Sequence, residues 1–313
     1  MKTRTSQKIY LGISSCLLGN KVRYDGNHKE QRLITQKLAT KFEFVPICPE
    51  MAIGLGVPRK PIRLIGDQTS QRAVEINNKE ADVTQQLISF GNQKARELDY
   101  ISGFIFKKDS PSCGLFSVKI YKGENSVLNK GMGLFAKQIV KHNPILPVEE
   151  EGRLNDEKLR RNFIQRVEVY HRWNQLLKSE LSKGKIIDFH SKHKFMLLAH
   201  CEKTYRETGR LISQIGNYDL NVFSDIYIAL LMSGLKKPET CNKHINVLQH
   251  IAGFFKRNLD SQDKYEFSQL IDNYREGIIP RVAVVTMLKH YLRKFPNSYL
   301  NKQYYLSHHH SGI

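Results

Sequence analysis

The chain has 313 residues, 40% of them hydrophobic and 25% charged, which is a globular composition with enough length for two domains. No apolar run approaches the roughly 20 residues that cross a bilayer, and the polar segment Met1 to Lys8 lacks the apolar stretch of a signal peptide, so we expect a cytoplasmic protein without a membrane partner. Lys and Arg number 49 against 30 Asp and Glu, a net charge of +19, which favours a polyanionic partner such as nucleic acid.

The first 148 residues alternate strand and helix patterns. The strands are expected at 8–15, 42–47, 101–106, 117–121 and 144–148, and the helices at 29–41, 81–98 and 131–142. Residues 51–79 contain glycines, prolines and two short β-rich runs, 61–65 and 72–76, so we predict a long loop that ends in a hairpin. This order predicts an α/β N-terminal domain over residues 1–148 with a mainly parallel, Rossmann-like sheet.

Three cysteines follow three of these predicted strands. Cys16, Cys48 and Cys113 each come after an apolar run, among Gly, Pro, Ser, Glu and Asp. Because the carboxyl ends of parallel strands meet at one edge of a sheet, we expect the three thiols to lie together. Three thiolates would bind a metal and leave one coordination position open, since structural zinc and iron-sulfur sites usually use four ligands. The alternative is three small buried residues, because free cysteine is often buried and these separations match no compact ligand motif.

Several short motifs in this part of the chain resemble a known family. They are Ser15-Cys16-Leu17-Leu18-Gly19, Val22-Arg23-Tyr24-Asp25-Gly26, Cys48-Pro49-Glu50, Gly54-Leu55-Gly56, Pro58-Arg59-Lys60-Pro61 and Ser110-Pro111-Ser112-Cys113-Gly114. In this order, over about the first 147 residues, they resemble the small bacterial thiouracil desulfurases. The resemblance implies a [4Fe-4S] cluster held by Cys16, Cys48 and Cys113, whose unligated iron takes the sulfur of a thiolated pyrimidine.

The resemblance also points to Glu50 and Ser110 as residues that assist the chemistry. The expected reaction is hydrolytic and redox-neutral: the open iron acts as a Lewis acid on the thione sulfur, and Glu50 activates the attacking water or relays a proton. Ser110 orients or protonates the substrate, and Asp25 and Ser112 are further candidates for catalytic residues. The alternatives are structural, because Glu50 can cap a turn and the two serines can be turn residues.

The end of the first domain carries two further patterns. Gly131-Met132-Gly133 opens the helix expected at 131–142. Such glycines can cradle a phosphate, but Gly-x-Gly alone is a weak signal, and close packing of helix on sheet explains them at least as well. The acidic run Glu149-Glu150-Glu151-Gly152 then marks a predicted linker, residues 149–157.

Beyond the linker the apolar period changes from two to 3.6 residues, which predicts an all-α domain over residues 158–313. Its helices are expected at 159–177, 186–201, 205–215, 222–235, 241–258, 262–277 and 280–295. His190, His193 and His200 share nearly one face of the second of these helices, and with Cys201 they suggest a zinc site. Histidines at helix interfaces often only bond neighbouring backbone, so both interpretations stay open.

This second part resembles the YbgA-type domain. Its motifs are Phe189-His190-Ser191-x-His193-Lys194, Leu198-Ala199-His200, Tyr205-Arg206-x-x-Gly209-Arg210-Leu211, Asn246-Val247-Leu248-Gln249-His250, Gly253-Phe254-Phe255-Lys256, Tyr274-Arg275-x-Gly277 and Tyr299-Leu300-x-x-Gln303-x-Tyr305-Leu306. The match covers about residues 155 to 306, and the ending Ser307 to Ile313 departs from the family's tail. A thiouracil-desulfurase-like domain fused to a YbgA-type domain resembles the transfer RNA 4-thiouridine desulfurases, in which the helical domain is thought to hold the RNA.

Both parts of the chain are basic. Residues 1–148 carry 23 basic and 12 acidic side chains, and the rest carry 26 and 18, which gives +11 and +8. Charge spread over the whole molecule suits a polynucleotide better than a free base, although a solvated cationic surface is the alternative. We therefore predict a desulfurase whose partner is tRNA or a thiolated nucleobase, converting 4-thiouridine in tRNA to uridine with release of sulfide; no protein partner is implied.

Two other classes of function stay open. One is an iron-sulfur, nucleic-acid-binding redox sensor, for which the sequence has no recognisable helix-turn-helix signature. The other is a cluster-dependent tRNA sulfur transferase. That class would be expected to carry an adenylation P-loop or to need a partner, and no Gly-x-x-x-x-Gly-Lys-Ser/Thr occurs here.

Overall fold

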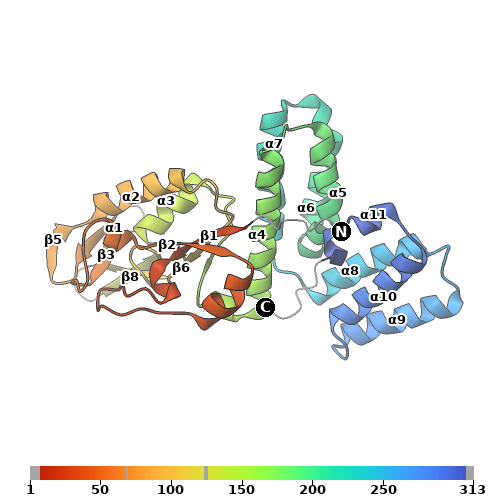
Figure 1. The fold of residues 1–313 in the computed structure, drawn as a ribbon, viewed down its shortest axis with the longest axis horizontal. Helices are drawn as coiled ribbons and strands as arrows, with labels where there is room; N and C mark the ends of the chain where they lie inside the picture. Colours follow the sequence, from red (N-terminus) through yellow and green to blue (C-terminus); the bar gives the residue numbers. More distant parts are fainter. Residues whose placement is uncertain (1–7, 68–69, 123–125, 308–313) are drawn as a thin grey trace. The chain divides into compact units, whose positions relative to one another are not determined.

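The computed structural model of the protein describes residues 8–67, 70–122 and 126–307. The chain separates into two compact units, the first ending at His171 and the second beginning at Arg172 (Figure 1). Each unit is described by itself. The expectations drawn from residues 1–7 and from the ending after Ser307 lie outside the described residues.

The first unit is built on a four-stranded parallel sheet. Its strands are β1 (Tyr10–Ser14), β2 (Glu43–Ile47), β6 (Phe104–Phe106) and β9 (Val148–Glu150), in the spatial order β2-β1-β6-β9. Every neighbouring pair is parallel, so the carboxyl ends of all four strands meet at one edge. The predicted α/β domain with a mainly parallel, Rossmann-like sheet is confirmed.

A second, mixed sheet completes this unit. Its order is β5-β4-β3-β7-β8, with β3 at Ile62–Gly66, β4 at Gln71–Glu75, β5 at Asn78–Asp82, β7 at Val118–Lys122 and β8 at Ser126–Gly131. The predicted hairpin is the antiparallel pair β3 and β4. The strands β5 and β8 were not expected, because the Asn, Lys, Glu and Asp residues among them are rare in strands. Pairing with β4 and β7 holds them extended.

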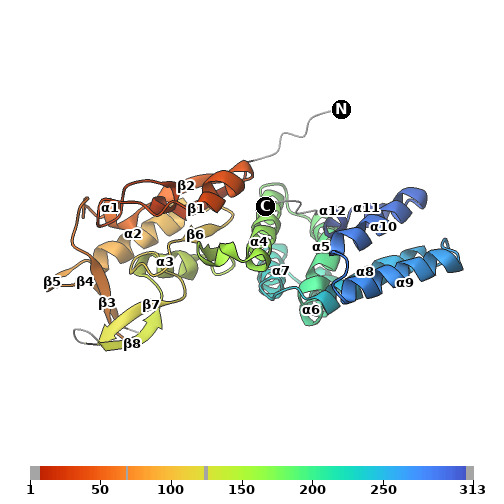
Figure 2. The ribbon, with the colours of Figure 1, turned by 90° about the horizontal axis from the view of Figure 1, so that it is seen from below.

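Three helices of the first unit are α1 (Pro49–Ala52), α2 (Thr84–Glu97) and α3 (Leu134–His142). α2 and α3 pack side by side, with the rings of Phe90 and Phe135 stacked at 5.7 Å between centroids (Figures 1 and 2). The helix expected at 29–41 is reduced to a π-helical turn at Leu33–Lys37 and a 3-10 turn at Leu38–Thr40. The apolar residues of this segment are still buried, because Ile34 and Leu38 pack in one cluster with the side chains of β1.

The last strand and the expected linker differ from the prediction. β9 begins at Val148 and not at 144, because a proline has no N–H for a strand ladder; Pro147 only accepts a bond from the Phe104 N–H at 2.9 Å. Residues expected as a linker form β9 and a 3-10 turn at Arg153–Asn155, and they are partly buried. Helix α4 (Glu157–Leu177) crosses the division between the units, and its first half packs Phe163 against the core of the first unit.

The second unit is helical, as predicted. It contains α5 (Lys183–His200), α6 (Glu202–Ser213), α7 (Leu220–Leu235), α8 (Cys241–Ala252), α9 (Ser261–Arg275), α10 (Arg281–Lys294) and the short, unpredicted α11 (Ser298–Asn301) and α12 (Tyr304–Ser307). Ser182, Asp219 and Thr240 cap the N-termini of α5, α7 and α8, as their side-chain chemistry favours. In the part of the chain that is described, no helix is both long and apolar enough to span a bilayer.

The three histidines suggested as zinc ligands have separate partners. Their Nδ1 atoms lie near three different oxygens: the Tyr227 hydroxyl for His190 (3.3 Å), the Phe189 carbonyl for His193 (2.7 Å) and the Lys237 carbonyl for His200 (2.7 Å). Each imidazole therefore bonds a separate neighbouring group, as the alternative interpretation expects.

Candidate active site

Three neighbouring strands of the parallel sheet each lead to one cysteine. Cys16 lies in the 3-10 turn after β1, Cys48 directly follows β2, and Cys113 lies in the loop after β6. All three line one cavity of about 500 Å³. The chain passes from β1 to β2 on one side and returns to β6 on the other, so the cavity lies where the strand order reverses, the usual ligand site of such sheets.

Burial disfavours the charged form of all three sulfurs. It raises the pKa of Cys16 to about 11, raises the pKa of Cys48, and raises the pKa of Cys113 well above its ordinary value. A negative charge on one sulfur raises the pKa of its neighbours further, because the three interact electrostatically. A positive centre bound among the three sulfurs would offset this cost and favour the thiolate forms.

Neighbouring groups partly stabilise a negative charge on each sulfur. The ammonium of Lys107 lowers the pKa of Cys16, and the Ser14 hydroxyl bonds to Cys113. Backbone amides at the start of α1 point to Cys48. These are interactions that tune a metal-bound thiolate, and they fit a metal centre better than three inert core thiols.

The donor set fits a cluster better than a single ion. Thiolates on one metal ion sit about 2.3 Å from it, and within the described residues no three or more Cys, His, Asp or Glu side chains are arranged to share one ion. In a cubane cluster each cysteine binds a different iron. Three thiols spread around a cavity of this size suit that arrangement.

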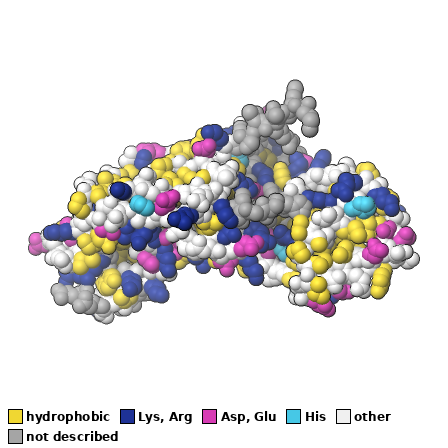
Figure 3. All heavy atoms as spheres, turned by 60° about the horizontal axis from the view of Figure 1, so that its bottom comes forward, with side chains coloured by type: hydrophobic (Ala, Val, Ile, Leu, Met, Phe, Trp, Pro, Cys, Tyr) yellow, Lys and Arg dark blue, Asp and Glu magenta, His cyan; other side chains and the backbone are white. Residues whose placement is uncertain are grey.

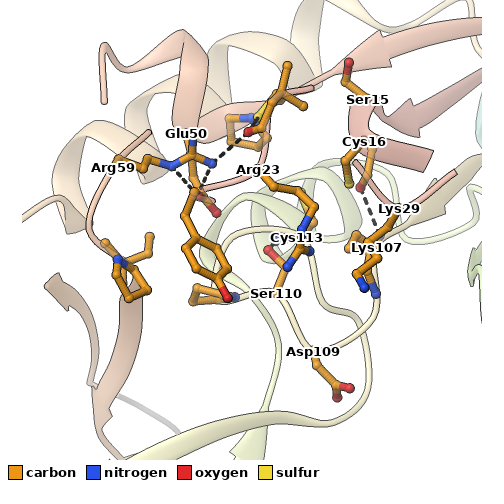
Figure 4. A pocket seen from close by; sticks show the side chains of 18 of the residues that line it. Ser15, Cys16, Arg23, Lys29, Glu50, Arg59, Lys107, Asp109, Ser110 and Cys113 are labelled. Carbon is orange, nitrogen blue, oxygen red and sulfur yellow. Dashed lines mark hydrogen bonds and ion pairs between the residues drawn. The ribbon is translucent and has the colours of Figure 1, made fainter. Parts of the chain in front are cut away.

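The carboxylate of Glu50 lines the same cavity and is fixed from two sides, of which Figure 4 shows the Arg59 side. Its Oε2 accepts bonds from Nε and Nη2 of Arg59 at 2.9 and 2.6 Å. Its Oε1 accepts a bond at 2.9 Å from the hydroxyl of Ser112, a fully buried residue. Arg59 in turn donates to the carbonyls of Gly56 and Val22, at 2.8 and 3.0 Å, so the ion pair is anchored to two loops.

The other predicted site residues have different positions. Ser110 lines the cavity, and its Oγ accepts bonds from the backbone N–H of Cys113 at 3.1 Å and of Ser112 at 3.3 Å. Asp25 is exposed and does not line the cavity. Its Oδ1 accepts the Asn27 N–H at 3.1 Å, a bond that lowers the pKa of Asp25. The structure thus gathers every predicted site residue except Asp25.

Sequence reasoning missed the residues that hold the cysteine loop. Glu151 accepts the backbone N–H of Lys108 at 2.6 Å and pairs with the ammonium of Lys107. Glu150 accepts the N–H groups of Leu115 and Phe116 at 2.8 and 3.1 Å. The acidic run expected as a linker therefore supports the loop that carries Ser110 and Cys113. Three glutamates directly after an apolar strand were the available signal.

The start of α3 decides between the two interpretations of Gly131-Met132-Gly133. The N–H groups of Leu134 and Phe135 donate to the carbonyls of Pro111 and Ser112, at 3.0 and 3.1 Å. A Cβ on Gly133 would lie 2.5 Å from the Ser112 carbonyl. These amides are already bonded to the cysteine loop, so the glycine permits close packing and the turn is not a phosphate cradle.

The cavity is lined by cations as well as by thiols. Arg23, Lys29, Lys107 and Lys108 line it together with Arg59. Figure 4 shows Lys29 and Lys107 beside Cys16 and Arg23 near Cys113. Glu50 and Asp109 are the acidic side chains of the lining. An anionic centre and an anionic substrate are therefore both favoured here.

Fold and site together define a class of protein: an α/β domain that presents three thiols and a fixed carboxylate in one cavity, followed by an all-helical domain. Residues 11–151 match the family model described as 2-thiouracil desulfurase, and residues 194–310 match a family described as a protein of unknown function (DUF1722). The chain belongs to the 2-thiouracil desulfurase family through its first domain and to the DUF1722, YbgA-type family through its second.

Two curated relatives each correspond to one part. The chain is 31% identical over 141 residues to the uncharacterized protein YbgA of Escherichia coli, covering 45% of this chain and 83% of that protein. It is 37% identical over 119 residues to the uncharacterized protein YbbK of Bacillus subtilis, covering 36% and 76%. A solved structure named as the [4Fe-4S]-dependent thiouracil desulfidase TudS is 31% identical, with a TM-score of 0.38 and coverage of 48% of this chain and 95% of its own.

Proposed function

We propose that this chain removes sulfur from a thiolated pyrimidine with a [4Fe-4S] cluster held by Cys16, Cys48 and Cys113, and that its substrate is 4-thiouridine in tRNA. The observation that carries the proposal is the cavity that joins three strand-end thiols to a fixed carboxylate. Membership of the 2-thiouracil desulfurase family supports the same chemistry. A cytoplasmic site of action is part of the proposal.

The reaction exchanges sulfur for oxygen without a change in oxidation state. One water adds to the ring carbon, the C–S bond breaks, and uridine and sulfide leave, so no electron donor is required. When bound, the cluster supplies an iron with an open coordination position, a Lewis acid for the thione sulfur. Three cysteine ligands leave that position free, since a cubane has four irons.

The protein's own side chains provide positioning and proton transfer. Glu50 accepts the proton of the attacking water and returns one to the leaving sulfur. Arg59 and Ser112 fix both of its oxygens, so the carboxylate does not turn away between the two steps. Ser110 holds the turn that carries Cys113 and, from the cavity lining, orients the base.

Charge supports a polynucleotide as substrate. Residues 172–307 contain 21 Lys and Arg against 12 Asp and Glu, a net charge of +9. On the face shown in Figure 3, Lys and Arg side chains are spread widely among the other types. A free thiolated base needs only a pocket, whereas each phosphate of an RNA can pair with a further Lys or Arg side chain and so strengthen binding. The helical domain is accordingly proposed to bind the RNA.

The test uses anaerobically reconstituted full-length protein, tRNA that contains 4-thiouridine, and no reductant. We expect the near-ultraviolet absorbance of the thionucleoside to disappear and an equal amount of sulfide to be released. The Glu50→Gln variant should keep the cluster and lose about 10²- to 10⁴-fold in rate. Consumption of free 2-thiouracil with intact 4-thiouridine in the RNA would refute the RNA substrate, and no reaction with either would refute the enzyme.

A further inference from the structure

An exposed aromatic ring on the helical unit is held in a fixed position. Phe254 lies in the 3-10 turn Gly253–Phe255 that ends α8 and is 45% exposed. One side of its ring stacks on Tyr299, at 5.5 Å between centroids and 21° between planes. The buried ring of Phe195 packs edge-on to both, at 6.3 and 6.0 Å. Because one face is covered, the exposed area of Phe254 lies on its other face and its edge.

One cation lies close to this aromatic pair, and three more follow its rings in the chain. The Lys194 ammonium lies 5.6 Å from the centroid of the Tyr205 ring and 5.9 Å from that of Tyr299. Lys256, Arg257 and Lys302, which follow the two stacked rings in the chain, are exposed. Lys194 belongs to α5, Tyr205 to α6 and Tyr299 to α11, and Phe254 follows α8; α5 packs against both α6 and α8.

We propose that Phe254, backed by Tyr299, is a stacking platform for an unpaired base of the RNA substrate, with the neighbouring cations on the RNA backbone. The proposal rests on the RNA substrate of the proposed function and names where the helical unit holds it. Proteins that bind unpaired RNA combine a flat aromatic face with flanking positive charge. An apolar protein partner would gain nothing from the surrounding lysines, whereas phosphates would.

A platform of this kind favours an unpaired base over a duplex. A stacking ring adds to the free energy of binding only when the base is unstacked from the RNA helix. Each base stacked on an aromatic ring adds enough binding free energy that its loss is readily measured. Loops and ends of a folded RNA present such bases. The platform therefore selects folded RNA with accessible loops over continuous double-stranded RNA.

The test is the dissociation constant of the full-length holoprotein for tRNA at one fixed salt concentration. Phe254→Ala should weaken binding about 5- to 150-fold, the equivalent of 1–3 kcal/mol for one stacked base. Phe254→Trp should retain affinity, and its indole fluorescence should be quenched by the RNA. Turnover of free 2-thiouracil should not change in either variant, because the thiol cavity lies in the first unit.

Tyr265→Ala is the matched control. Tyr265 is 65% exposed on α9, its chain neighbours Asp263, Lys264 and Glu266 are of mixed charge, and no ring of the described residues stacks on it. We expect its removal to leave RNA binding unchanged. If Phe254→Ala binds tRNA like the wild type while the wild type still desulfurates it, the platform is refuted and the proposed function stands. If the wild type does not bind tRNA, the RNA substrate itself fails.

Two further outcomes would assign the surface to something else. A loss of thermal stability in Phe254→Ala, together with slower turnover of free 2-thiouracil, would make the ring a structural element. A change in self-association with unchanged RNA affinity would make the surface an interface with a second copy of the chain. Either result overturns the proposal.

Discussion

Replacing Arg59 with methionine tests whether the Glu50 ion pair is the structural centre of the cavity. The Arg59 side chain is 6% exposed and that of Glu50 is 15% exposed. Arg59→Met keeps much of the volume but leaves a largely buried carboxylate without its cation. Removal of one partner from a buried pair destabilises by about 3–5 kcal/mol. Because Glu50 lines the cavity and keeps 15% exposure, we expect about 3 kcal/mol, the lower end of that range.

Urea denaturation measures this loss, with far-ultraviolet circular dichroism as the signal. The chain has a single tryptophan, Trp173, which lies in the second unit and is buried there. Its fluorescence therefore reports on the helical unit and serves as an internal control. We expect Arg59→Met to lower the urea concentration at which the first unit unfolds. The urea midpoint reported by tryptophan fluorescence should not change.

The double variant Glu50→Gln with Arg59→Met separates an unpaired charge from a general loss of packing. It removes both charges, so it should recover most of the stability that Arg59→Met loses. Turnover should stay low in both, since Glu50 is displaced in one and absent in the other. If the free energy of unfolding of Arg59→Met lies within about 1 kcal/mol of the wild-type value and its turnover is normal, the ion pair does not position Glu50 and the reasoning is refuted.

The remaining predictions concern the cluster, the domain boundary and pH. Serine in place of any cavity cysteine should abolish binding of about four irons per chain, whereas Cys241→Ser should bind iron as the wild type does. A chain cut after residue 171 should fold, as seen by a cooperative urea transition, and one cut after 149 should not, because the first half of α4 belongs to that core. Burial opposes the charge of Glu239, but bonds from two histidines outweigh it and hold the pKa of Glu239 well below its usual 4.5. Glu239→Gln should therefore lower stability by about 3 kcal/mol at pH 7. The difference should shrink as the pH falls below the usual 4.5 of a free carboxyl and should be lost once the pH is below the depressed pKa of Glu239.

The sequence alone predicted the two kinds of architecture and the meeting of the thiols. Apolar periodicity changes from two to 3.6 near residue 150, and that change follows from burial alone. Three cysteines placed after strands must converge once those strands are parallel neighbours. The order β2-β1-β6 makes them so.

Features that depend on long-range pairing were not predictable. β5 reads as Asn-Lys-Glu-Ala-Asp, and only the neighbouring β4 makes it a strand. Arg59 lies in a motif with lysine and two prolines, where an exposed cation is the usual expectation; its burial comes from Glu50 and two loop carbonyls. Glu150 and Glu151 look like a solvated run until the amides of the cysteine loop are placed beside them.

The central claim is that the cavity hydrolyses the C–S bond of 4-thiouridine in RNA. The most direct measurement is a turnover of the holoprotein in water enriched in ¹⁸O, without reductant, followed by mass spectrometry of the nucleosides from the digested tRNA. We predict one ¹⁸O atom in each uridine formed and one sulfide released with it. Unlabelled uridine, or conversion that begins only when a reductant is added, would contradict the hydrolytic account.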